Sequence, residues 1–138
     1  MPPSPSPTSP SRLFTVEPVP TTAVSIGEVI RTTIGLADPV CDPKGWDATA
    51  PCKRFLLVAP RDGVLTVILS AEIPGTRSDV IDLMLISPSG PYAYSGGGAE
   101  QEVSTTVIGG STYEIRINSY PYLLPSPGNL EFELKIRM

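Results

Sequence analysis

Few residues in this chain could do chemistry, and histidine is not among them. The sequence has no histidine, so neither a Ser–His–Asp nor a Cys–His catalytic group can be assembled. What remains is a pair of carboxylates of the kind that glycosidases use, either Asp79 with Asp82 or Glu100 with Glu102. Glu100 and Glu102 are two residues apart, a spacing typical of the solvated face of a strand. The chain is therefore predicted not to be an enzyme.

Asp79 and Asp82 open an otherwise apolar segment, DVIDLMLIS (79–87). Because an isolated buried carboxylate is costly, we expect at least Asp82 to find hydrogen bonds or a cation. One interpretation is structural, with Asp82 accepting backbone N–H bonds from a neighbouring loop. The other is a calcium site, which needs about six to eight oxygen ligands, and only the two aspartates and loop carbonyls are in view. The prediction is therefore no cofactor, with calcium at Asp79 and Asp82 as the alternative.

Two cysteines, Cys41 and Cys52, bracket the turn-rich loop CDPKGWDATAPC. In a small β-rich chain this arrangement predicts a disulfide and an oxidising, extracellular compartment. The alternatives are two free thiols or half of a metal site, although a structural zinc site would lack ligands without histidine or further cysteine. A loop this short would contribute about 2–3 kcal/mol in the chain-entropy model.

Aromatic side chains in or beside loops are the candidate ligand-binding groups. They are Trp46, Tyr92, Tyr94, Tyr120 and Tyr122. A rigid ring can grip a sugar or a peptide at little entropic cost. The structural alternative is that Trp46 packs over the disulfide and that the tyrosines hold loops against the edge of the fold. Three other aromatic residues fall on inward faces and are expected in the core: Phe55, Tyr113 and Phe132.

Strict alternation of apolar and charged residues indicates which elements position these groups. In NLEFELKIRM (129–138) every second residue is apolar, and STYEIRIN (111–118) repeats the pattern. A period of two sends one set of side chains into a core and the other into water. The pattern predicts antiparallel sheets that are apolar on one face and solvated on the other.

About eight short strands are expected, punctuated by 17 prolines and 12 glycines. The segments 63–72 and 79–87 are apolar on both faces, and 23–36 is interrupted by a turn or bulge at Gly27. The predicted fold is therefore all-β, an antiparallel two-sheet β-sandwich that is jelly-roll-like. The remaining expected strands are 53–59, 91–95, 99–110, 111–118 and 129–138, with 12–16 as a short edge strand or part of the linker.

The 138 residues fit one domain. Residues 1–22 are predicted to be a Pro/Ser-rich linker with an edge strand, and residues 23–138 the sandwich. The Pro/Ser run favours extended polyproline II, which makes a semi-rigid spacer; a disordered N-terminus is the alternative. The net charge of −4, without any Lys/Arg run, argues against nucleic acid as a partner. No apolar run approaches the roughly 18 residues of a membrane span.

Four segments in this order resemble the bacterial pre-peptidase C-terminal domain, over roughly residues 23–138. They are APRDGVLTVILSAE, DVIDLMLISPSG, EQEVSTTVIGGSTYEIRINSY and GNLEFELKI. The resemblance implies a small non-catalytic β-sandwich appended to a secreted bacterial protease or another exported enzyme. Some members resemble the collagen-binding modules of clostridial collagenases, and some of those bind calcium. Here a Pro/Ser run stands in place of the acidic linker that supplies calcium ligands there.

These features together predict a non-catalytic accessory or binding module of a secreted bacterial protein, attached to an exported enzyme. Its partner would be an extracellular polysaccharide or protein, held by loop aromatics, with no nucleic acid and no membrane span. One rival is a structural subunit in which a strand such as 12–24 adds to a neighbour's sheet edge, so both a monomer and an edge-strand assembly are open. Another is a calcium-stabilised spacer or processing domain.

Overall fold

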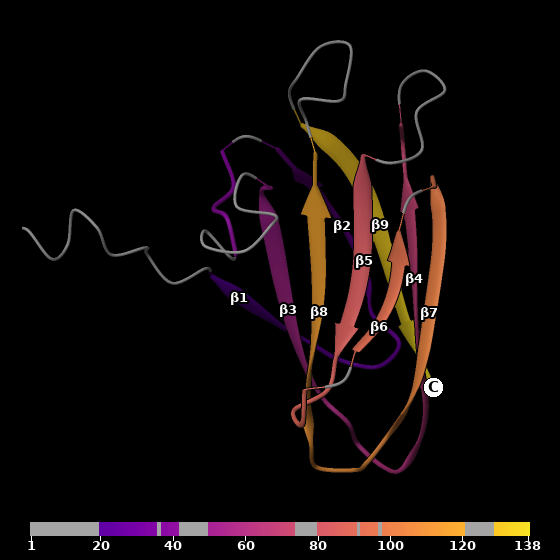
Figure 1. The fold of residues 1–138 in the computed structure, drawn as a ribbon. Coiled ribbons are helices and arrows are strands. Elements are labelled where there is room, and N and C mark those ends of the chain that lie inside the picture. The colour runs from indigo at the N-terminus through magenta and orange to yellow at the C-terminus, as the bar shows by residue number, and fades with distance from the viewer. Residues whose placement is uncertain are drawn as a thin grey trace, which may run out of the picture.

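The computed structural model describes residues 20–35, 37–41, 50–73, 80–90, 92–96, 98–120 and 129–138. These ranges hold nine strands in two stacked sheets (Figure 1). One sheet consists of β1 (Thr21–Val24), β3 (Cys52–Val58), β8 (Thr112–Ser119), β5 (Ile81–Ile86) and β6 (Tyr92–Gly96), in that order. The other consists of β2 (Val29–Ile34), β9 (Leu130–Arg137), β4 (Gly63–Ala71) and β7 (Glu100–Val107). Within the described ranges, no helix has the length and apolar character that crossing a bilayer requires.

Eight of the strands form a jelly roll. Counted from β2 as the first strand, the sheets have the orders 2-7-4-5 and 1-8-3-6, the arrangement that two Greek keys produce. All pairings among these eight strands are antiparallel, whereas β1 joins the outer edge of β3 in parallel. The predicted all-β, jelly-roll-like sandwich is therefore confirmed, with β1 as an additional edge strand.

A tight turn at residues 25–28 carries the chain from one sheet to the other. Gly27 has a φ of 92°, which suits glycine because it has no Cβ. The Ser25 N–H donates to Glu28 Oε1 at 2.6 Å and the Gly27 N–H to the Ile136 carbonyl at 2.7 Å. The segment predicted as strand at 23–36 thus divides into β1 and β2, which belong to different sheets. The edge strand predicted at 12–16 lies outside the described residues.

One aliphatic layer fills the space between the sheets. Inward side chains of β4, β5 and β8 are fully buried, at 0% exposure: Leu65, Val67, Leu69, Leu83, Leu85, Ile115 and Ile117. The aromatic residues expected in the core, Phe55, Tyr113 and Phe132, are each 4% exposed, so that prediction is confirmed. The alternation read from the sequence therefore reports the inner and outer faces of both sheets correctly.

The predicted disulfide joins Cys41 to Cys52, with 5.5 Å between their Cα atoms. Cys52 is the first residue of β3 and is 1% exposed. The Cys52 N–H also donates to the Pro39 carbonyl at 2.8 Å. The bond therefore anchors the segment before β3 to the start of that strand. Trp46, expected to pack over this disulfide or to bind ligand, lies outside the described residues.

Two valines of β4 test whether this layer carries the stability of the fold. Val67 is 0% exposed and Val64 is 55% exposed. We expect Val67→Ala to lower the free energy of unfolding by about 2–3 kcal/mol, because it removes two buried methyl groups and leaves a cavity. Val64→Ala, the matched control in the same strand, should cost less than about 1 kcal/mol. Urea denaturation measures both, and equal losses would contradict the assignment of the core.

Candidate functional site

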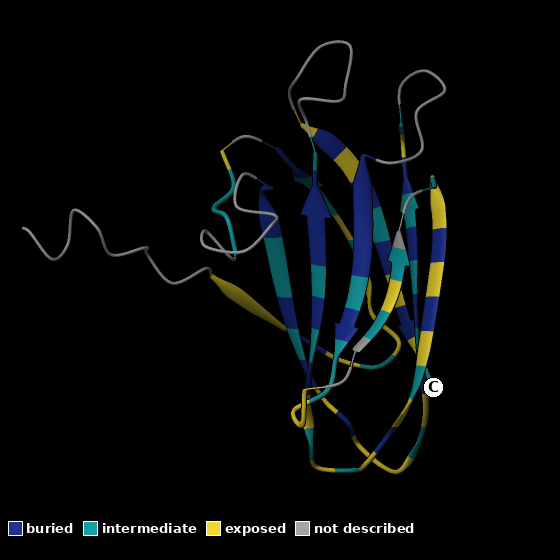
Figure 2. Cartoon of the chain, in the orientation of Figure 1, coloured by how far each residue is buried: buried dark blue, intermediate teal, exposed yellow. Residues whose placement is uncertain are grey.

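The outward side chains of the two sheets differ in character. We call the outer face of the four-stranded sheet the four-strand face. Its outward side chains are mainly Glu, Lys, Arg, Ser and Thr. We call the outer face of the five-stranded sheet the five-strand face. Aliphatic residues and arginines dominate its outward side chains, and many of these side chains are half-buried. In Figure 2, β7 alternates between exposed and buried, whereas β8 and β5 alternate between half-buried and buried. The outward residues of the five-strand face include Thr21, Ala23, Arg54, Leu56, Val58, Asp82, Met84, Ile86, Tyr94, Thr112, Glu114, Arg116 and Asn118.

Asp82 sits at one corner of the five-strand face and is only 6% exposed. Its Oδ2 atom accepts hydrogen bonds from the hydroxyls of Tyr94, at 3.1 Å, and Tyr120, at 2.9 Å. Tyr94 comes from β6, whereas Tyr120 directly follows β8 and donates its N–H to the Val80 carbonyl at 2.8 Å. Two of the hydrogen bonds that a buried carboxylate requires therefore come from tyrosine hydroxyls.

The structure brings together two of the five aromatic residues proposed as ligand contacts. Tyr94 and Tyr120 meet at Asp82, and the Tyr94 side chain remains 49% exposed. Tyr92 lies two residues before Tyr94 in β6, with its backbone opposite Ile86. Tyr122, like Trp46, lies outside the described residues. The hydrogen bonds at Asp82 fit the structural interpretation, and the exposure of Tyr94 fits the binding interpretation. The assignment of these tyrosines to a ligand therefore stays a prediction.

The calcium alternative also stays a prediction. Asp79 lies outside the described residues, and its predicted partner Asp82 bonds to two tyrosines. Among the side chains that the structure describes, no three acidic, histidine or cysteine groups are placed to share a metal ion.

An ion triad lies at the centre of the five-strand face. Glu114 of β8 accepts from Arg54 Nη2 at 2.9 Å through Oε1 and from Arg116 Nε at 2.7 Å through Oε2. The side chains are 13% exposed for Glu114, 29% for Arg54 and 25% for Arg116. Burial by itself raises the pKa of Glu114, but the hydrogen bonds and charges of the two arginines outweigh it and hold this pKa below 4.5. Glu114 is therefore ionised at neutral pH.

This triad was not predicted from the sequence. Glu114 and Arg116 occupy consecutive outward positions in the alternating segment 111–118, so the pattern places them on one face. Arg54 joins them only through the register of β3 against β8, where it lies directly opposite Arg116. A pairing of β3 with β8, which the sequence does not specify, was the missing information.

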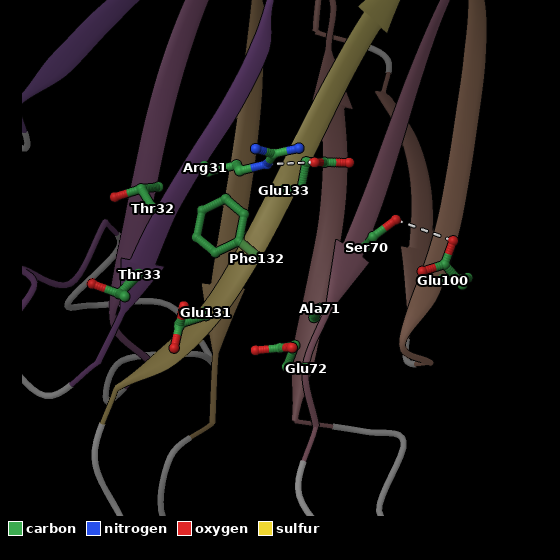
Figure 3. A pocket seen from close by; sticks show the side chains of 10 residues that line it. All are labelled: Arg31, Thr32, Thr33, Ser70, Ala71, Glu72, Glu100, Glu131, Phe132 and Glu133. Carbon is green, nitrogen blue, oxygen red and sulfur yellow. Dashed lines mark hydrogen bonds and ion pairs between the residues drawn. The ribbon is translucent and has the colours of Figure 1, made fainter.

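A shallow groove of about 610 Å³ crosses the four-strand face (Figure 3). Its polar lining is mainly carboxylate, and Arg31 pairs with Glu133 at 2.7 Å while the Ser70 hydroxyl donates to Glu100 at 3.1 Å. The hydrogen bond from Arg31 lowers the pKa of Glu133, which keeps this carboxylate ionised. Glu100 and Glu102 are both exposed on β7, as expected of a solvated strand face. The polar groups of this groove are therefore typical of ion pairs on a solvent-exposed strand face.

Comparison of the fold with solved structures gives a clear match. The pre-peptidase C-terminal domain of collagenase from Bacillus anthracis, known from a 1.0 Å crystal structure, superimposes with a TM-score of 0.62. The match covers 89% of this chain and 100% of that domain, at 15% sequence identity. This chain has the fold of a pre-peptidase C-terminal domain. The fold implied by the resemblance of the four sequence segments is thereby confirmed.

The other comparisons are weaker or empty. Two periplasmic inhibitors of g-type lysozyme, PliG from Aeromonas hydrophila and from Salmonella Typhimurium, give TM-scores of 0.42 and 0.43 at 10% and 12% identity. The matches cover 85% and 84% of this chain and 97% and 98% of those proteins. No protein-family model matches the sequence, and no curated protein does either. The comparisons therefore establish similarity to one fold, that of the pre-peptidase C-terminal domain.

The depressed pKa of Glu114 predicts a specific dependence of stability on pH. Because the folded-state pKa lies below 4.5, the stability contributed by the ionised carboxylate is complete above about pH 4.5. It is lost as the pH falls from there through the folded-state pKa. Glu114→Gln should therefore melt at a lower temperature than the parent at pH 7, and the gap should narrow below pH 4.5.

Thermal melts between pH 7 and pH 3 measure this gap. The matched control is Glu102→Gln on the four-strand face, because Glu102 is exposed and no described side chain pairs with it. A gap between Glu114→Gln and the parent that stays constant over the whole range would contradict the role given to the triad.

Proposed function

We propose that this chain is a non-catalytic binding module of an exported bacterial protein, attached to an enzyme, and that it binds an extracellular polymer or protein through the five-strand face. The observation that supports this most is the composition of that face. Aliphatic side chains, a tyrosine ring that is 49% exposed and two arginines lie on the outside of the five-stranded sheet.

Such a composition is typical of the centre of a recognition surface. Tyrosine, methionine and arginine are enriched there, and lysine and glutamate are depleted. The face carries Tyr94, Met84, Arg54 and Arg116, and its one glutamate, Glu114, is bound between the arginines. The four-strand face has the opposite composition, so the two sides of the sandwich would not compete for the same partner.

The strands also hold these groups in fixed positions. Met84 lies between Arg116 on β8 and Tyr94 on β6 in the ladder of the sheet, and the hydroxyl of Tyr94 is bound to Asp82. Side chains that are ordered before a partner arrives lose less entropy when it binds. A surface of this kind can bind a partner without a conformational change and without a catalytic group.

Two further facts support an exported role. The Cys41–Cys52 disulfide is of the kind that persists in oxidising compartments. The Bacillus anthracis structure of similar fold is a domain of a collagenase, so a unit of this fold occurs as part of a larger enzyme. We infer the same arrangement here, with the chemistry supplied by the attached domain and the binding by this one.

Pull-down on insoluble collagen, chitin and cellulose tests the proposal. At least one of these should retain the protein, and Ile86→Ala or Tyr94→Ala should weaken retention by about fivefold or more, since each removes an apolar or aromatic group of the face beside the ion triad. The matched control is Ile68→Ala, because Ile68 is also a half-buried isoleucine pointing outward from an inner strand, but on the four-strand face.

Melting temperatures must accompany the binding data, so that loss of fold is not read as loss of contact. If Ile68→Ala weakens retention as much as Ile86→Ala at equal melting temperature, the five-strand face is not the binding surface.

A further inference from the structure

We propose that the partner of the five-strand face is a polypeptide that carries carboxylates, and that Arg54 and Arg116 bind one of them together. This inference deepens the proposed function and rests on it. It names the chemistry of the partner and the two residues that select it.

The charge balance of the ion triad is the first argument. Arg54 and Arg116 are direct cross-strand neighbours, a position in which like charges destabilise a sheet. Only one carboxylate, Glu114, lies between them, and its low pKa keeps it ionised. The triad therefore carries a net charge of +1 at the centre of the face. A second carboxylate would neutralise it.

The remaining hydrogen-bond donors are the second argument. A guanidinium has five N–H donors in a fixed plane. Arg54 donates to Glu114 through Nη2 and Arg116 through Nε. Arg54 Nε is buried, so a carboxylate from outside cannot reach it. Arg54 Nη1 and both terminal nitrogens of Arg116 make no hydrogen bond to a described residue. The two arginines thus retain terminal donors of the paired geometry that binds a carboxylate in a bidentate manner.

The neighbours of the triad favour a peptide. Leu56 and Ile86 are half-buried and flank Glu114 on either side. Apolar neighbours lower the local dielectric and so strengthen a charge-assisted hydrogen bond. They also offer contacts to apolar side chains, whereas sugar platforms rely on stacked rings, and Tyr94 is the single exposed aromatic side chain that the structure describes on this face.

The spacing across the sheet matches an extended chain. Arg116 and Tyr94 lie in the same row, separated by Met84 on the strand between them. Two strand spacings are about 10 Å, the span of about three residues of extended peptide. In polyproline II, an extended conformation with three residues per turn and a rise of about 3.1 Å per residue, residues three positions apart point to the same side. A segment of this conformation with a carboxylate and an aromatic or apolar residue three positions apart would therefore contact Arg116 and Tyr94 at once.

The four-strand face is negatively charged and would repel the same partner. Its outward side chains include five glutamates and three cations: Glu72, Glu100, Glu102, Glu131 and Glu133 against Arg31, Lys135 and Arg137. Its net charge is therefore −2, whereas the charged residues of the five-strand face, Arg54 and Arg116 against Glu114 and Asp82, sum to zero, with the +1 of the triad at its centre. An acidic segment is thus directed to one side of the sandwich.

Fluorescence anisotropy with labelled copolymers tests the inference. The probe is a random copolymer of glutamate and tyrosine, and the reference is a copolymer of lysine and tyrosine with the same tyrosine content. The protein should bind the acidic probe and not the basic one, and Arg54→Gln or Arg116→Gln should weaken binding about tenfold. Arg31→Gln is the matched control, because it removes the same charge from the four-strand face.

Glu114→Gln gives the sharpest result, because it should act in opposite directions on stability and on binding. It removes the internal competitor and raises the charge of the cluster to +2, so the acidic probe should bind at least threefold more tightly, while the melting temperature at pH 7 falls. A purely structural triad predicts weaker or unchanged binding. Binding should also weaken as sodium chloride rises, since salt screens exposed charges.

The outcomes separate this inference from the proposed function. If Ile86→Ala and Tyr94→Ala reduce retention on polymer while the arginine variants change nothing, the proposed function stands and this inference is wrong. Equal effects of Arg116→Gln and Arg31→Gln, or weaker binding by a folded Glu114→Gln protein, would also overturn it. If no variant of the five-strand face changes any binding, both proposals fail.

Discussion

Burial of one aliphatic layer between two sheets is the constraint on which the rest of this structure depends. Apart from Ser119, every inward position of β4, β5 and β8 is apolar, and almost all are fully buried. The strand period of two then fixes which residues face outward. An outward residue cannot be moved to the core without moving its whole strand by one position, which would expose the entire apolar set. The core therefore determines the composition of both outer faces.

The five-strand face shows how polar groups are accommodated on a sheet that is half-buried. Asp82 is satisfied in part by two tyrosine hydroxyls, and Glu114 by two guanidinium groups. In both places a carboxylate gathers donors from neighbouring strands, so the polar contacts cross-link β3, β8, β5 and β6 on top of the backbone ladder. Loss of one partner would leave the other partly buried and without a hydrogen bond. This lowers the free energy of unfolding by more than the hydrogen bond itself contributes.

The sequence predicted the fold well because burial and alternation are local properties. The inward placement of Phe55, Tyr113 and Phe132, the turn at Gly27 and the Cys41–Cys52 bond all follow from patterns within about a dozen residues. The division of 23–36 between two sheets was not predicted, because both halves read as strand and only the jelly-roll topology separates them.

The candidate site was predicted less completely, because it depends on which strands are neighbours. Tyr94 and Tyr120 were identified as binding candidates from their residue type, but their convergence on Asp82 requires β5 to lie between β6 and β8. Arg54 meets Glu114 only through the register of β3 against β8. Contacts between residues some 60 positions apart, such as this one, leave no trace in a single sequence.

The central claim is that the outer face of the five-stranded sheet is the recognition surface. Amide chemical shifts of the ¹⁵N-labelled domain, recorded while the copolymer of glutamate and tyrosine is added, test it most directly. The account predicts that the perturbed amides gather on β3, β8, β5 and β6, around Arg54, Arg116 and Met84. Perturbations confined to β2, β9, β4 and β7, or spread evenly over both sheets, would contradict it.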